Sequence, residues 1–129
     1  METQVDGPYR TFTAVDVTDL AGKEFHLVEV DPTTGGIQLV NSGFAIGVIH
    51  NRLQGSEDFN VRLLGKGGTV KVVAGGAIAV GDRVKAGSDG KVVTAGSSGR
   101  SLGVKLSPVG NSADGDIIEI VDVIDTLDT

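Results

Sequence analysis

The feature that most constrains the fold is an Asp89-Gly90 pair between two short β-rich runs. The runs cover Asp82 to Ala86 and Lys91 to Thr94, and Gly81 adds a turn residue before the first of them. Asp-Gly is among the strongest hairpin signals because both central residues of a type I′ turn need a positive φ. The sequence therefore predicts a β-hairpin at this place.

Composition extends this prediction to the whole chain. Glycine occurs 20 times in 129 residues without a collagen-like period, which is typical of many short strands separated by turns. Val and Ile together number 27 against 9 Leu. Since β-branched side chains favour the pleated surface of a sheet, the sequence predicts an all-β fold, specifically a small β-barrel or β-tulip-like domain.

The turn residues divide the chain into an arm, one domain and a tail. Residues 1–11 are polar and contain Pro8, which cannot donate to a sheet ladder, so we expect an extended N-terminal arm. Residues 12–124 are predicted to form a single β-barrel domain, since this length suits one core. Residues 125–129 form an acidic tail that we expect to fray.

A weak internal sequence repeat relates the two halves of the chain. Gly47 and Gly103 stand 56 positions apart in similar apolar-Gly-Val contexts, and a β-rich run begins 14 residues after each. The run Leu27 to Val30 has a counterpart at the same offset in Arg83 to Ala86. Regular alternation of strands and turns could produce the same pattern. The internal repeat nevertheless indicates two related half-barrels, which together could close a small barrel and remove exposed edges.

Charge and cysteine content exclude several classes of partner. The formal net charge of −6 disfavours nucleic acid and anionic membranes, because binding to phosphates depends on Lys and Arg. The chain has no Cys, so disulfides, thiolate metal ligands and a Cys nucleophile are excluded. The N-terminus lacks a signal-like apolar run, and no stretch has the length of a membrane span, so we expect synthesis in a cytoplasm.

No constellation of residues predicts an active site. Gly65 to Thr69 looks like a phosphate loop, but Gly67 follows Lys66 where Ser or Thr is required. Asn111 to Asp116 lacks the ligand spacing of a calcium loop, and His26 and His50 each stand alone. We therefore expect a protein that is not an enzyme and that needs no cofactor and no metal.

Two resemblances involve the hairpin. The stretch from Val80 to Gly87 resembles the hammerhead turn of biotinyl and lipoyl carrier domains, although Met1 is the only Met and Lys91 follows the tip in place of the usual carrier setting. The second resemblance covers roughly Val70 to Val123. Its elements are Ala79 to Val84, Asp89 to Val92, Leu102 to Leu106 and Gly115 to Ile120.

In their order and spacing these elements resemble the capsid cement, or head decoration, proteins of tailed bacteriophages. Lys105 departs from the small residue usual after the Gly-Val pair, and the N-terminal half is not covered. The residues that carry the hairpin and fold motif are Gly81, Asp82, Asp89, Gly90, Gly103 and Gly115.

The resemblance implies a homotrimer in the virion, assembled in the host cytoplasm, that binds the outer capsid surface. It would clamp neighbouring major capsid protein subunits and stabilise the expanded shell. The alternative is a non-catalytic binding or carrier-like module of another phage or bacterial assembly. An ordered arm must gain hydrogen bonds to offset its lost entropy, so we hypothesise that it adds a strand to a coat-protein sheet. The hypothesised capsid-binding residues are Thr3, Gln4, Val5, Asp6, Gly7, Pro8, Tyr9, Arg10 and Thr11.

Overall fold

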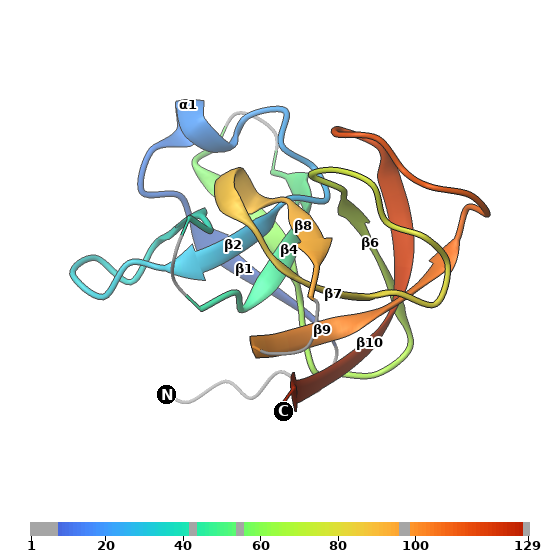
Figure 1. Cartoon of the computed structure of the whole chain (residues 1–129). Helices are drawn as coiled ribbons and strands as arrows, with labels where there is room; N and C mark the ends of the chain where they lie inside the picture. The colour runs from blue at the N-terminus through green and yellow to red at the C-terminus, as the bar shows by residue number, and fades with distance from the viewer. Residues whose placement is uncertain (1–7, 42–43, 54–55, 96–98, 128–129) are drawn as a thin grey trace.

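The computed structural model describes residues 8–41, 44–53, 56–95 and 99–127. Ten strands and one short helix make up the described fold (Figure 1). The first half contains β1 (Tyr9–Thr13), α1 (Val17–Leu20), β2 (Leu27–Val30), β3 (Ile37–Leu39), β4 (Gly47–Arg52) and β5 (Asp58–Leu63). The second half contains β6 (Thr69–Val73), β7 (Arg83–Ala86), β8 (Val92–Thr94), β9 (Gly99–Ser107) and β10 (Ile117–Leu127), with a 3₁₀ turn at Ser88–Gly90.

The strands form two antiparallel five-stranded sheets, one from each half. Sheet A has the order β1-β5-β4-β2-β3, and sheet B has the order β6-β10-β9-β7-β8. The two orders are the same when each strand of the first half is matched with its counterpart in the second. The all-β prediction is confirmed, and so is the prediction of two related halves.

The prediction of a closed barrel is wrong, because the strands separate into two sheets. Within each sheet, one isolated parallel bridge links the ends of the two edge strands: Ala14 to Ile37 in sheet A, and Ala74 to Val92 in sheet B. A flat sheet cannot bring its two edges together, so each sheet must curl. Each half therefore resembles a small, partly open barrel.

The strand register shows that the internal sequence repeat corresponds to a repeat in the structure. Val28 pairs with Gly47 in sheet A, and Val84 pairs with Gly103 in sheet B, each 56 positions after its counterpart. Both glycines lie where a neighbouring strand comes very close. A Cβ on Gly47 would lie 2.6 Å from the carbonyl oxygen of Arg62, and one on Gly103 would lie 1.9 Å from that of Val121. Only glycine fits at either position.

The predicted hairpin is confirmed as β7 and β8, with Val84 opposite Thr94. Asp89 and Gly90 both have positive φ, 59° and 73°, and the N–H of Lys91 donates to the carbonyl of Ser88, as a type I′ turn requires.

The tip of this hairpin packs onto sheet A. Gly90 is buried, and its N–H donates to the carbonyl of Val40 at 2.8 Å. A Cβ at Gly90 would lie 2.7 Å from the carbonyl oxygen of Leu27. The turn that the sequence predicts thus also joins the two halves.

Two hydrophobic clusters share β2 and β4, because adjacent residues of a strand point to opposite faces. Leu27 and Val48 belong to the larger cluster, which combines residues of both sheets. Val28 and Ile49 belong to a second cluster that also contains Leu20 of α1. The short helix, which the sequence analysis did not predict, begins at the N-cap Asp16 and covers this second cluster.

The predicted domain boundaries shift at both ends. Tyr9 to Thr11, expected in a free arm, belong to β1 and pair with β5. Residues 125–127, expected to fray, continue β10 and pair with β9. Thr3, Gln4, Val5, Asp6 and Gly7 lie outside the described residues, as do residues 128–129.

Candidate functional site: the exposed edge strand β1

Strand β1 is the most exposed strand of sheet A, and it lies at an edge of that sheet. Four of its five residues are exposed, and Phe12 is half-buried. The guanidinium of Arg10 lies 4.7 Å from the centre of the Phe12 ring. Thr11 and Thr13 donate side-chain hydrogen bonds to Asn60 and Asp58 of β5, at 2.8 and 2.9 Å. The strand is therefore held firmly on one side only.

Backbone geometry shows which groups face outward. The carbonyl of Pro8 accepts from the N–H of Leu63 at 2.6 Å, and the N–H of Ala14 donates to the carbonyl of Glu57 at 2.9 Å. Even-numbered residues of β1 therefore face β5, and odd-numbered ones point away from it. The backbone groups of Tyr9, Thr11 and Thr13 therefore point away from β5, and of these the carbonyl of Thr13 lies close to Gly36, so Tyr9 and Thr11 form the open edge.

No described strand pairs with this open edge along β1. Only at its end does the chain reach β3, where the N–H of Val15 donates to the carbonyl of Ile37 at 2.9 Å. A row of outward N–H and C=O groups is a template for an added strand.

Strand β6, the counterpart of β1 in sheet B, is contacted by sheet A at both ends of its outer edge. The N–H of Val73 donates to the carbonyl of Phe25 at 3.2 Å, which joins β6 to sheet A. The carbonyl of Thr69 lies 3.5 Å from the guanidinium of Arg62. The two first strands thus occupy equivalent places but have different surroundings.

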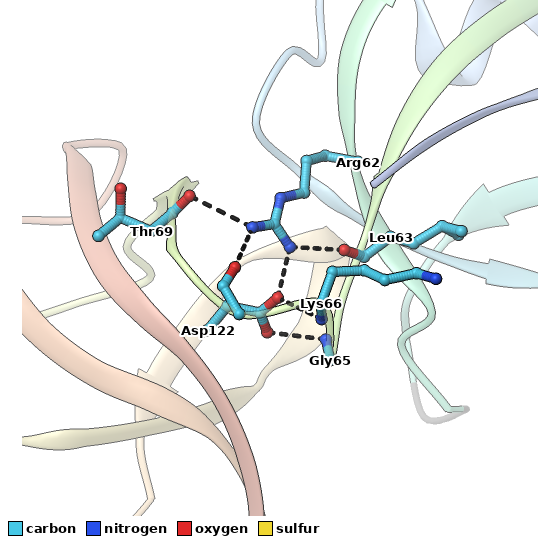
Figure 2. A network of polar contacts seen from close by, with 7 residues as sticks. Arg62, Leu63, Gly65, Lys66, Thr69 and Asp122 are labelled. Carbon is cyan, nitrogen blue, oxygen red and sulfur yellow. Dashed lines mark hydrogen bonds and ion pairs between the residues drawn. The ribbon is translucent and has the colours of Figure 1, made fainter. Parts of the chain in front are cut away.

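An ion pair between Arg62 of β5 and Asp122 of β10 joins the two halves (Figure 2). Both residues are buried. The carboxylate of Asp122 also accepts from the backbone N–H groups of Gly65 and Lys66, at 2.8 and 2.9 Å. The guanidinium donates as well to the carbonyls of Leu63 and Gly67. Because each charge is paired and hydrogen-bonded, the network holds the connection between the sheets and leaves no reactive group free.

This network was not predicted from the sequence, although the sequence carries a signal for it. Ile118, Ile120 and Asp122 alternate along one face of β10, and Ile118 and Ile120 are core residues. An acidic residue in phase with two core residues predicts a buried partner.

Lys105 is a second buried polar residue that the sequence analysis did not place. Its ammonium donates to the carbonyls of Ile78 and Gly110, both at 2.7 Å. Lys105, which departs from the cement pattern, therefore connects two loops through these hydrogen bonds.

The fold-motif residues have structural roles. Gly81 and Gly115 adopt positive φ in turns, at 93° and 94°. The carboxylate of Asp82 accepts from the N–H of Ala79 at 2.9 Å. Gly90 at the tip of the β7–β8 hairpin is buried against sheet A, and Lys91 forms an ion pair with Asp114 at 3.0 Å, so this geometry differs from a carrier domain that presents its lysine freely.

The remaining candidate residues from the sequence do not gather into a reactive or metal-binding cluster in the described part of the chain. His26 is half-buried, and desolvation lowers its pKa from the ordinary value of 6.5. His50 packs against Tyr9, with ring centroids 4.9 Å apart. Among the described residues, no three His, Cys, Asp or Glu side chains gather where they could hold a metal ion. No helix in the described ranges has the length and apolar character needed to cross a membrane.

The fold defines the chain as an all-β protein of two duplicated five-stranded halves. No protein-family profile matches the sequence, and no curated protein sequence matches it. Among solved structures, the chain is similar to the N base of the head fiber gp8.5 of bacteriophage phi29, with a TM-score of 0.60. The two are 19% identical, and the match covers 89% of this chain and 94% of that chain. At this identity the likeness establishes the fold, and the resemblance to cement proteins stays a prediction.

Proposed function

We propose that this chain is a non-catalytic structural protein of a phage head, bound to the outside of the shell. The observation that carries the proposal is the likeness to the N base of a phage head fiber, because the match covers nearly all of both chains. The cement-like elements of the C-terminal half support the same class of protein independently. In this proposal the protein binds as a homotrimer and clamps neighbouring major capsid protein subunits.

The outer edge of β1 is the proposed contact with the coat. A coat strand added there would pair with the outward backbone groups of Tyr9 and Thr11, within the hypothesised segment Thr3 to Thr11. Each backbone hydrogen bond contributes about 1 kcal/mol net, so one subunit would bind weakly. A trimer would engage three such edges at high effective concentration, which makes the clamp useful.

A proline at Thr11 tests this contact while keeping the domain folded. Its N–H points to the open edge, so Thr11→Pro removes a donor that β5 does not use. We expect the variant to keep its solution mass but to lose binding to expanded heads in a co-sedimentation assay. Thr11→Val, which keeps the N–H, is the matched control and should bind normally.

Full head binding by Thr11→Pro would rule out strand addition at β1. Failure of the wild-type protein to bind any expanded head would contradict the proposed function itself. Light scattering on the wild-type protein, with a mass near three times 13.2 kDa expected, tests the trimer separately.

A further inference from the structure

A small basic hollow opens where β7 and β9 of sheet B meet the segment that precedes β4 in sheet A. Its volume is about 220 Å³. Lys85 of β7 and Arg100 of β9 supply its charges, and no Asp or Glu is among the described residues that line it. The hollow therefore carries an excess of positive charge on a chain whose formal net charge is −6. The lining residues are Phe44, Ala45, Lys85, Ala86, Arg100 and Leu102.

The two cations of the hollow have no counter-charge. Neither Lys85 nor Arg100 forms an ion pair with a residue in the described ranges. Glu29 stands 56 positions before Lys85, at the equivalent place in sheet A, and the amide of Gln38 on the neighbouring strand donates to its carboxylate at 2.8 Å. Lys85 has Val93 opposite it instead, which offers no polar side chain. The unpaired cation is therefore specific to sheet B.

The guanidinium of Arg100 is held in place by its surroundings. It donates to the carbonyl of Ala45 at 2.8 Å, and it lies 3.7 Å from the centre of the Phe44 ring. These contacts use one N–H group and one face of the guanidinium, so its other donors remain available to a ligand. Burial also lowers the pKa of Arg100 from its ordinary value, because the charge is partly removed from water. A desolvated charge without a counter-charge is unfavourable, so an anion would be stabilised here.

The shape of the hollow favours a carboxylate on an aliphatic stem. Ala45 and Leu102 are buried, and Ala86 is half-buried, so these three residues give the hollow an apolar floor. Phe44 is 64% exposed and presents an aromatic ring at the rim. A Glu side chain has a stem that can lie on this floor and a carboxylate that can accept charge-assisted hydrogen bonds from both cations.

We propose that this hollow binds an acidic side chain from a peptide segment of a protein partner, with its carboxylate between Lys85 and Arg100. Charge complementarity chooses the occupant, because two unpaired cations without a lining acid require a negative group. The hollow shares no residue with the open edge of β1. The contact therefore goes beyond the proposed function and does not depend on it.

Titration of isotope-labelled protein with the peptide hexaglutamate tests the contact by NMR. The whole chain repels this peptide, since its net charge is −6, so binding requires a local basic site. We expect concentration-dependent shifts of the Arg100 Nε–H and of the backbone amides of Ala86 and Leu102. Added NaCl should weaken the response, because it screens charges that are only partly buried. Hexaglutamine, which is neutral, should give no shifts.

Charge-matched variants separate this site from general electrostatics. Lys85→Gln should weaken hexaglutamate binding about threefold, and Lys85→Gln/Arg100→Gln at least about tenfold. The single variant leaves the hydrogen bond from Arg100 to Ala45 intact, so a folding defect does not explain its effect. Arg52→Gln/Lys66→Gln is the matched control, because it removes one Arg and one Lys that do not line the hollow. It should change the affinity by less than about twofold.

Three results would overturn the inference: no hexaglutamate shifts at the hollow, an equal loss of binding in the matched control, or a larger response to hexathymidylate than to hexaglutamate. The last result would assign the hollow to phosphates of a nucleic acid. None of these results bears on head binding by the wild-type protein. Failure of this inference is therefore distinguishable from failure of the proposed function.

Discussion

The two halves of the molecule share one strand order, yet their first strands have different surroundings. The outer edge of β1 points to solvent along most of its length, whereas the edge of β6 reaches sheet A through the Val73 to Phe25 hydrogen bond. An exact pair of halves would leave two similar edges. The difference teaches that the same strand position can contact the other sheet in one half and keep an open edge in the other.

The largest expected effect concerns the ion pair that joins the halves. Asp122→Ala should lower the free energy of unfolding by about 3–5 kcal/mol, because it leaves the buried Arg62 charge without its partner. Urea unfolding followed by circular dichroism would measure this. In a double-mutant cycle, Arg62→Met combined with Asp122→Ala should cost clearly less than the sum of the single changes, and strict additivity would show that the pair is not coupled.

The equivalent glycines provide the next test of the comparison. Gly103→Ala should cost about 3 kcal/mol or more, because its Cβ would overlap a backbone carbonyl that cannot move alone. Gly47→Ala should cost about 2 kcal/mol, since one of the two close atoms belongs to the side chain of Val61. Gly76→Ala, where the Cβ meets nothing within 4 Å, is the control for thermal unfolding. Equal stability of all three variants would contradict the close approach of the strands.

Proline substitution distinguishes the open edge from the covered one. Thr11→Pro should change the unfolding free energy by no more than about 1 kcal/mol, because its N–H faces outward. Val73→Pro should cost about 3 kcal/mol or more, because it removes the hydrogen bond to Phe25 from a buried position. Similar losses in the two variants would mean that the two edges do not differ in the way described.

The smallest expected effect is a pH dependence at the contact between the halves. Desolvation lowers the pKa of His26 below 6.5, so the unfolded chain binds the proton more tightly than the folded one. Unfolding free energy should therefore fall as the pH decreases from about 6.5 toward the folded-state pKa, and it should be unaffected by this group above that range. Comparing His26→Gln with the wild-type protein between pH 5 and 8 checks this, since the variant should flatten the profile.

Much of the fold could be predicted from sequence because it depends on local chemistry. The β7–β8 hairpin follows from Asp89 and Gly90, whose preferred backbone conformations fit a type I′ turn. The relation between the halves follows from Gly47 and Gly103, because a close strand contact excludes every other side chain. The buried alternation of β10 was also visible, although its continuation to Leu127 was not.

The candidate site was predicted only in part. Partner contact at the N-terminal segment stays a hypothesis, and the assignment of Tyr9 to Thr11 to a free arm is wrong. Whether β1 pairs with sheet A depends on β5, which lies far away in the sequence. Local strand propensity cannot predict that pairing.

The sequence by itself determined the strand-and-turn character of this protein, its duplication and its hairpin, since each depends on residues close together in the chain. Only the tertiary structure decided that the halves form two curled sheets, that Arg62 finds Asp122 across 60 positions, and that β1 keeps an open edge. These features depend on contacts between segments that are far apart in the sequence, and the packing of the whole core determines which of these contacts form.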